Sequence, residues 1–277
     1  MIRLDLSFAE LLPENTYEAR ADRICELYAT KLRMTAPRAI EVRYAFPFTE
    51  CTWPMIGLST AEHSFMMAQL IVPTYLEFLD LFQNKDIAPE SLESVALHHD
   101  DAEALTGDAA TDVDGVTRSM KDAAEAKSIY RQYHGMVCHS YMREKFESYE
   151  AKESYLSKLV KMHDAVDLVL FAQYCVQNGV GMLSRGAKEG EFVLNAFGEK
   201  RTVDSRTHKE IREYLVDGKA AEVPISHVMY DHSLPRIKKL GCPELTGLFK
   251  LLCARAFEFP FEQYNLERLP MDFAKLA

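Results

Sequence analysis

The stretch His98-His99-Asp100-Asp101-Ala102-Glu103-Ala104-Leu105-Thr106-Gly107-Asp108 decides how this chain is interpreted. It places imidazoles and carboxylates close together, directly after an apolar segment. On a helix, Glu103 would follow His99 by four residues and Asp100 by three, so the three side chains would share a face. Like charges beside buried apolar residues are unfavourable unless a cation compensates them. Imidazole with carboxylate suits a first-row divalent ion such as Mn, Co, Ni, Fe or Zn, and a solvated acidic helix end is the alternative.

Two residues elsewhere in the chain have the same chemistry. His63 lies near the start of an apolar, helix-forming stretch, where a lone histidine is more often a packed core residue. Asp164 lies inside a long apolar stretch, although aspartate is a weak helix former and is seldom buried without a partner. An acid on the polar face of that helix is the alternative. Neither residue identifies a site by itself.

Helical periodicity dominates the chain. Ser59-Thr60-Ala61-Glu62 has the form of a capping box, and the apolar stretch after it predicts a helix that runs to Pro73. Ala88-Pro89-Glu90 predicts a second helix start, with a glycine stop at Gly107. Further helices are predicted over residues of about 117–148, 151–177 and 243–259.

The composition changes after Gly179, where glycines become frequent. Phe192-Val193-Leu194 favours the start of a short β-hairpin. The sequence therefore predicts an all-α fold, a helical bundle with a C-terminal extension in which a short β-hairpin is expected. We expect an N-terminal helical segment, a core and a C-terminal region packed on that core, over residues 1–44, 45–180 and 181–277.

The bulk composition is that of an ordinary soluble globular chain. Lys plus Arg total 32 and Asp plus Glu total 42, which gives a net charge of -10 over 277 residues. This sign disfavours nucleic-acid polymers and anionic membranes as partners, and taken alone it would disfavour phosphate-bearing substrates too. The sequence shows no secretory signal, no apolar run of about 18 residues, and six cysteines without a Cys-x-x-Cys pair. We therefore expect a cytoplasmic protein with reduced thiols.

The order of these motifs resembles that of the HD-domain metal-dependent phosphohydrolases, and most of all their bacterial 5′-deoxynucleotidase branch. That branch has Trp-Pro, Glu-His-Ser, His-Asp-x-x-Glu-x-Leu-Thr-Gly-Asp and a later Asp-Ala pair. The resemblance covers roughly residues 50 to 175, and its most specific part is the Leu-Thr-Gly-Asp after His-Asp. The matching segments here are Trp53-Pro54, Glu62-His63-Ser64, His99-Asp100 through Asp108, and Asp164-Ala165.

The resemblance implies a compact helical bundle that binds one divalent transition metal and leaves positions open for water and a phosphate oxygen. Glu103 matches the proton-transfer acid of the family, and Asp108 matches a carboxylate that positions or activates the nucleophile. Trp53 matches a residue that packs against the sugar and helps to select deoxyribose, with a core anchor as the alternative. The implied metal ligands are His63, His99, Asp100 and Asp164.

The chain departs from its relatives beside the tryptophan. They carry an arginine immediately before it that reaches the phosphate, whereas this chain has Thr52. The stretch between Trp53 and His63 is also shorter than in those relatives. Either another cation contacts the phosphate or the substrate differs. The candidates for this contact are Arg43, Arg118 and Lys121.

These features predict a phosphohydrolase that removes the 5′-phosphate from deoxynucleoside monophosphates. A deoxynucleoside triphosphate triphosphohydrolase or another small phosphomonoesterase is the alternative enzyme. Hydrolases of pyrophosphorylated guanosine rank lower, because they usually follow His-Asp with an adjacent Glu-Asp pair where this chain has Glu103-Ala104. The other class is a non-catalytic nucleotide-binding module, although all four implied ligands are present. The relatives tend to form dimers, so a homodimer is the expected assembly, without a sequence feature that identifies its interface.

Overall fold

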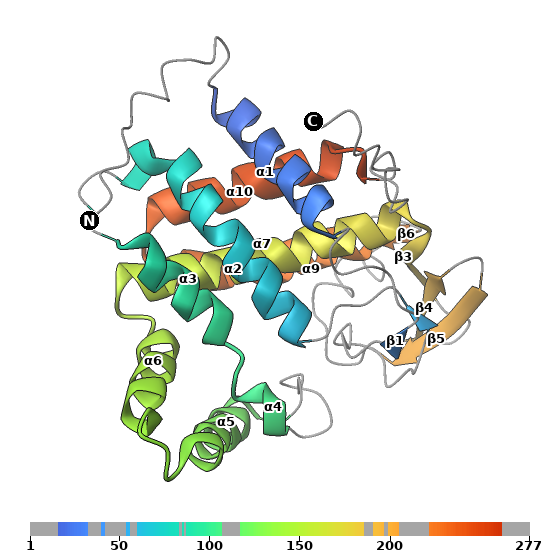
Figure 1. Cartoon of the computed structure of the whole chain (residues 1–277). Helices are drawn as coiled ribbons and strands as arrows, with labels where there is room; N and C mark the ends of the chain where they lie inside the picture. The colour runs from blue at the N-terminus through green and yellow to red at the C-terminus, as the bar shows by residue number, and fades with distance from the viewer. Residues whose placement is uncertain are drawn as a thin grey trace, which may run out of the picture.

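The computed structural model describes residues 16–32, 40–41, 54–55, 60–82, 85, 87–106, 117–185, 191–196, 199–204 and 222–261. Within these residues the chain is a helical bundle with a small antiparallel sheet at one end (Figure 1). The helices are α1 (Tyr17–Leu32), α2 (Thr60–Glu77), the 3-10 helix η3 (Leu79–Phe82), α3 (Pro89–His98), α4 (Glu103–Thr106), α5 (Arg118–Tyr133), α6 (His139–Ala151), α7 (Tyr155–Gln177), α9 (Ile225–Lys238) and α10 (Pro243–Glu258). This confirms the predicted helical fold class.

Helix α7 is the central element of the bundle. It runs from the end where α5 and α6 lie to the end where the sheet lies (Figure 1). Most of its residues from Leu159 to Cys175 are buried, and they share one hydrophobic core with α1, α2, α3, α9 and α10. Its start is set by Ser154, whose hydroxyl accepts a hydrogen bond from the Ser157 amide at 3.0 Å. The predicted long helix is confirmed, with its first residue four positions later than expected.

Helix α2 continues past Pro73, where the sequence predicted its end. Pro73 lies inside the helix, which runs on to Glu77. The proline removes one backbone donor, but the last turn is held by burial of Thr74, Tyr75 and the following Phe78. The Thr74 hydroxyl also donates to the Leu70 carbonyl at 2.8 Å. Tertiary packing therefore outweighs the local preference of proline for a helix end.

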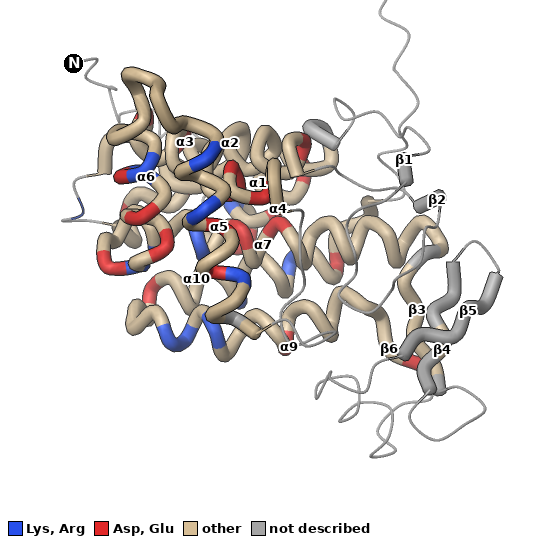
Figure 2. Tube along the Cα trace, turned by 90° about the horizontal axis from the view of Figure 1, so that it is seen from below, with Lys and Arg blue, Asp and Glu red and all other residues tan. Residues whose placement is uncertain are grey.

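The helix-favouring region of residues 117–148 forms two helices, α5 and α6. Helix α5 begins after Thr117, whose hydroxyl accepts from the Met120 amide, and ends before Gly135. Gly135 has a φ of 82°, in the left-handed region that glycine adopts readily. The chain then turns into α6. Both helices carry many charged residues (Figure 2).

The C-terminal strands form a larger sheet than the expected hairpin. The strands β3 (Val180–Arg185), β4 (Glu191–Ala196), β5 (Glu199–Asp204) and β6 (Glu222–Pro224) pair antiparallel in the order β5-β4-β3-β6. The predicted Phe192-Val193-Leu194 segment lies in β4, and the short pair β1 (Ile40–Glu41) and β2 (Pro54–Met55) lies elsewhere. The hairpin prediction is thus confirmed, with two added strands.

The last two helices close the core over α7. Helix α9 was not predicted, and α10 agrees with the predicted helix over 243–259. Ile225, Val228 and Met229 of α9 are buried, as are Leu245, Leu248 and Leu252 of α10. Arg255 of α10 pairs with Asp22 of α1 at 2.7 Å, which joins the two ends of the described chain. The expected boundaries at residues 44/45 and 180/181 stay predictions.

The described helices are those of a globular bundle. None of them is both long enough and apolar enough to cross a membrane.

Candidate metal centre

A cluster of imidazoles and carboxylates lies where α2, α3 and α7 meet. His63 comes from the first turn of α2, and His99 and Asp100 come from the turn directly after α3. Asp164 comes from the middle of α7. The structure therefore brings together all four residues that the resemblance implied as metal ligands. Both histidines are buried, at 3% exposure each.

The donor atoms of His63, His99 and Asp164 all lie within 4.8 Å of one another, and Asp100 places a further oxygen near both imidazoles. The Nε2 atom of His63 lies 3.2 Å from Nε2 of His99, 3.4 Å from Oδ1 of Asp164 and 3.6 Å from Oδ2 of Asp100. Nε2 of His99 lies 3.2 Å from Asp100 Oδ2 and 3.9 Å from Asp164 Oδ1. Ligand atoms that each bind one ion at about 2.0–2.2 Å lie about 3–4 Å apart. The observed spacings fit a shared divalent ion.

Each imidazole is held through its other nitrogen. Nδ1 of His99 lies 2.7 Å from the carbonyl oxygen of Ala96, and Nδ1 of His63 lies 2.7 Å from Oδ2 of Asp167. A carbonyl or carboxylate oxygen accepts hydrogen bonds, so both Nδ1 atoms are assigned as protonated donors. In the neutral rings both Nε2 atoms then present lone pairs to the same space. Two facing lone pairs with two nearby carboxylates are an environment for a cation.

The charges of the cluster perturb its titration strongly. Burial lowers the pKa of His63, but hydrogen bonds to Asp164 and Asp167 outweigh burial and hold that pKa well above its ordinary value. Burial raises the pKa of Asp164, but Lys161 and His63 outweigh it and hold that pKa well below its ordinary value. The carboxylate of Asp164 is therefore ionised at neutral pH.

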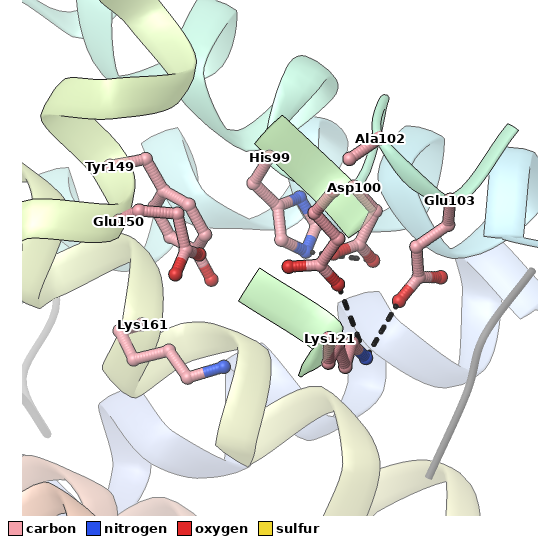
Figure 3. A pocket seen from close by; sticks show the side chains of 9 residues that line it. His99, Asp100, Ala102, Glu103, Lys121, Tyr149, Glu150 and Lys161 are labelled. Carbon is pink, nitrogen blue, oxygen red and sulfur yellow. Dashed lines mark hydrogen bonds and ion pairs between the residues drawn. The ribbon is translucent and has the colours of Figure 1, made fainter. Parts of the chain in front are cut away.

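A polar pocket opens beside this cluster (Figure 3). Its lining includes His99 and Asp100 from the cluster and further residues from α4, α5, α6 and α7. Lys161 of α7 and Lys121 of α5 both reach into it, and the Lys161 ammonium lies 2.6 Å from Asp164 Oδ2. Burial lowers the pKa of Lys161, but Asp164 and other acids outweigh burial, so this pKa is raised and the ammonium is charged. The pocket thus places two cations next to the cluster.

Glu103 lines the same pocket from α4. Its Oε1 lies 3.3 Å from the Lys121 ammonium, and its Oε2 accepts a long hydrogen bond of 3.4 Å from the Thr60 hydroxyl. Its side chain is 9% exposed. Lys121 also pairs with Glu125 at 3.4 Å. The carboxylate of Glu103 is therefore oriented from two sides beside the cluster, where it can exchange a proton with a group in the pocket.

The His-Asp segment is a turn and not the continuous helix that the sequence predicted. Helix α3 ends at His98, α4 begins at Glu103, and the intervening amides bond three residues back, as from Glu103 to Asp100 at 2.9 Å. Helix α5 stabilises this break: Gln132 donates to the Asp101 carbonyl at 2.7 Å, and Ser128 donates to the Ala102 carbonyl. His99, Asp100 and Glu103 therefore do not share one helical face as predicted, although all three line one pocket.

Several predicted site residues lie outside the described residues. These are Asp108, Trp53, Thr52 and Arg43, whose predicted roles stay predictions. Arg118 begins α5, but its side chain is not among those described. Of the three proposed substitutes for the missing arginine, Lys121 is the one that the described side chains place in the pocket.

The sequence interpretation missed two residues of α7 that contact the cluster, Lys161 and Asp167. With Asp164 they form a series at three-residue spacing on a helix that is otherwise largely apolar. That spacing was visible in the sequence and was a usable signal. His163 of the same helix packs in the core. It is fully buried against Thr74 and Met67, and burial lowers its pKa to about 4.

Two buried imidazoles, with the carboxylates of Asp164 and Asp100 near them and a polar pocket beside them, define a candidate hydrolytic metal centre. The sequence profile described as HD domain matches residues 52–211, more than half of the chain, so the chain belongs to the HD domain family. HD domains are generally metal-dependent hydrolases, and the His63, His99 and Asp164 cluster fits the binding of a divalent metal. No curated protein and no solved structure matches the chain significantly.

Proposed function

We propose that this protein is a divalent-metal-dependent phosphohydrolase that removes the 5′-phosphate from deoxynucleoside monophosphates and releases a nucleoside and inorganic phosphate. The observation that carries the proposal is the orientation of the two imidazoles. Hydrogen bonds from Nδ1 to Ala96 and to Asp167 leave both Nε2 lone pairs directed at each other 3.2 Å apart. A metal cation bound by both Nε2 atoms would occupy this space in place of the proton that the raised pKa of His63 gives the ring in its absence.

The residues that would hold one transition-metal ion (Co, Mn, Ni, Fe or Zn) are the four cluster residues. When bound, such an ion polarises a phosphoryl group and lowers the pKa of a water molecule beside it. The cluster residues offer two imidazole nitrogens and carboxylate oxygens, a donor set that these metals prefer. The proposed ligands are His63, His99, Asp100 and Asp164.

The pocket residues supply the remaining chemistry in this proposal. Lys121 and Lys161 bind phosphoryl oxygens and take the part of the arginine that Thr52 replaces. Glu103 holds the proton that is exchanged with the attacking water or the leaving oxygen, because its carboxylate lies in the pocket next to Asp100. Asp108 and Trp53 keep their predicted roles, at the nucleophile and at the deoxyribose.

The net charge of -10 fits this substrate better than it first suggested. The charge that repels polyanions includes the carboxylates that bind the metal, and the bound metal with the two lysines then attracts one small phosphate ester. We accordingly propose a single nucleotide as the ligand, and neither a nucleic-acid polymer nor a membrane.

Phosphate release from a substrate panel tests the proposal. Metal-free protein is mixed with deoxynucleoside monophosphates, ribonucleoside monophosphates or deoxynucleoside triphosphates, each with added Co²⁺ or Mn²⁺. We expect inorganic phosphate from the deoxynucleoside monophosphates, and no release when a chelator is added. Release of triphosphate from the triphosphates would establish the triphosphohydrolase alternative. Metal binding without turnover on any member would favour the non-catalytic nucleotide-binding module.

A further inference from the structure

Asp167 is a buried carboxylate that supports the cluster from behind. It lies on α7, and its side chain has 0% exposure. Its Oδ2 accepts the hydrogen bond from Nδ1 of His63 at 2.7 Å, and its buried Oδ1 has no hydrogen-bond partner among the described residues. From Val166 to Gln177, Asp167 is the sole charged residue in the sequence of α7.

A carboxylate in such a place needs a compensating charge. Burial of an ionised carboxylate among apolar side chains is strongly unfavourable unless the group is paired and hydrogen-bonded. Among the described residues, the hydrogen bond of the Asp167 side chain is the one to the His63 ring. The charge of Asp167 is therefore balanced through His63 and through whatever His63 binds on its other nitrogen.

We infer that Asp167 is a positioning residue that fixes the His63 ring with Nδ1 protonated, directs Nε2 at the metal position and strengthens its donation to the ion. The inference rests on the proposed function, because it requires that the cluster holds a divalent ion. Metal-bound histidines commonly donate their second N–H to a carboxylate or a carbonyl, and these supports raise ligand basicity. Asp167 would thus set the metal affinity without touching the metal.

The two imidazoles of the cluster provide an internal comparison. His63 donates to the charged Asp167, whereas His99 donates to the neutral carbonyl of Ala96 at the same distance of 2.7 Å. Both rings are fixed in orientation, so the difference between them is the charge of the acceptor. Charge-assisted hydrogen bonds are roughly twice as strong as neutral ones. Of the two imidazoles, His63 is accordingly the one whose Nε2 lone pair donates more strongly to a metal ion.

The test is the variant Asp167→Asn, which keeps the size of the side chain and one oxygen acceptor but removes the charge. Titration calorimetry of the metal-free protein with Mn²⁺ or Zn²⁺ should show affinity about 10- to 100-fold weaker than in the unaltered protein. Asp22→Asn is the matched control, because it makes the same substitution at another aspartate. Asp22 lies on α1 and pairs with Arg255 of α10. We expect unchanged metal affinity in that control.

A spectroscopic measurement separates positioning from folding. In the zinc-loaded protein with ¹⁵N-labelled histidine, NMR should show His63 protonated at Nδ1 and not at Nε2. The hydrogen-bonded Nδ1–H resonance should move upfield in Asp167→Asn, since a neutral oxygen is a weaker acceptor than a carboxylate. Circular dichroism and thermal unfolding of the metal-free variant check its fold, and if it does not fold, the NMR of the unaltered protein decides.

Each remaining outcome has a defined meaning. Metal binding by the unaltered protein with equal affinity in Asp167→Asn, or His63 protonated at Nε2, overturns this inference and leaves the proposed function standing. Absence of any divalent-metal binding by the unaltered protein overturns both.

Discussion

The site has two sides that are built by different physical means. The buried side, which consists of His63, His99 and Asp167, is at most 3% exposed, and both of its Nδ1 atoms donate to acceptors inside the core. The charged side, defined as Glu103, Lys121, Glu125 and Glu150, comes from α4, α5 and α6 and is joined by ion pairs such as Lys121 with Glu125.

This difference indicates that the two sides of the site have different functions. The hydrogen bonds of the buried side have acceptors that cannot exchange with solvent, so the two Nε2 atoms are preorganised for one ligand geometry. The charged side consists of ion pairs at a pocket wall, where an incoming phosphate oxygen can replace a carboxylate beside a lysine. The buried side is therefore suited to hold a metal, and the charged side to bind and protonate a substrate.

The largest effect is expected from a ligand of the cluster. Asp100→Ala removes an oxygen that lies 3.2 Å from His99 Nε2 and 3.6 Å from His63 Nε2. We expect loss of both metal binding and turnover, because the remaining side chains no longer complete the donor set. Calorimetry with Mn²⁺ and phosphate release measure the two properties. Full metal affinity in this variant would remove Asp100 from the ligand set and weaken the contrast between the two sides.

The next effect is expected on the charged side. Glu103→Gln keeps the size of the side chain and a contact to Thr60, but it cannot exchange a proton. Turnover should fall by about 10² to 10⁴, the range for loss of a general acid or base, with metal affinity unchanged. The same calorimetry and phosphate assay apply. Full activity in this variant would contradict the proton-transfer role of Glu103. Lost metal affinity would show that Glu103 is one of the metal ligands.

The parts of this picture that could be predicted from sequence are the ones with local signals. The cluster residues were recognised because their motifs and order carry a family pattern, although their spatial convergence depends on α2, α3 and α7 packing together. Helices α5, α7 and α10 were predicted from periodicity and composition. Helix α9 was not, because it carries Pro235 and His227 among its apolar residues and has no clear amphipathic pattern.

The parts that could not be predicted depend on contacts between distant segments. The turn between α3 and α4 is stabilised by Ser128 and Gln132 of α5, which lie 26 and 31 residues after the carbonyls to which they donate. The spacing of Asp167 from Asp164 is visible in the sequence, but its role as a support of His63 depends on a contact between α2 and α7 that the sequence does not give. The four-stranded sheet depends on β6, a strand of three residues that no sequence pattern indicated.

A smaller effect is expected from the two lysines of the pocket. Lys121→Met and Lys161→Met each remove a cation proposed to bind a phosphoryl oxygen, and a hydrogen bond to a charged group contributes about 1.5–3 kcal/mol. KM for a deoxynucleoside monophosphate and the inhibition constant of inorganic phosphate should rise about 10-fold or more. Lys127→Met, on the exposed face of α5, is the control and should change neither.

Lys161 contacts both sides of the site. Its ammonium lies 2.6 Å from the proposed ligand Asp164 while it lines the pocket. If Lys161→Met alters KM and phosphate inhibition but not metal affinity, Lys161 acts with the charged side. If metal affinity changes and phosphate inhibition does not, Lys161 acts with the buried side and the phosphate contact must come from elsewhere.

The smallest effect compares two cysteines, one buried in α7 and one exposed at the start of α6. Cys175 of α7 is buried, and burial raises its pKa from 9.0 to about 12, whereas Cys138 at the start of α6 is exposed. Above pH 9 an unfolded thiol loses its proton while Cys175 in the fold keeps it. The unfolded state then binds fewer protons, so the free energy of unfolding should fall with rising pH, by about 1.4 kcal/mol per pH unit for this thiol.

Urea unfolding at several pH values between about 9 and about 11 measures this slope. Cys175→Ala should reduce the slope by the share of one thiol, even if the cavity it leaves lowers stability at every pH. Cys138→Ala replaces an exposed thiol and is the control for the substitution itself. An equal slope in all three proteins would mean that burial in the α7 core does not keep the Cys175 thiol protonated, and the core behind the buried side would then not be dry.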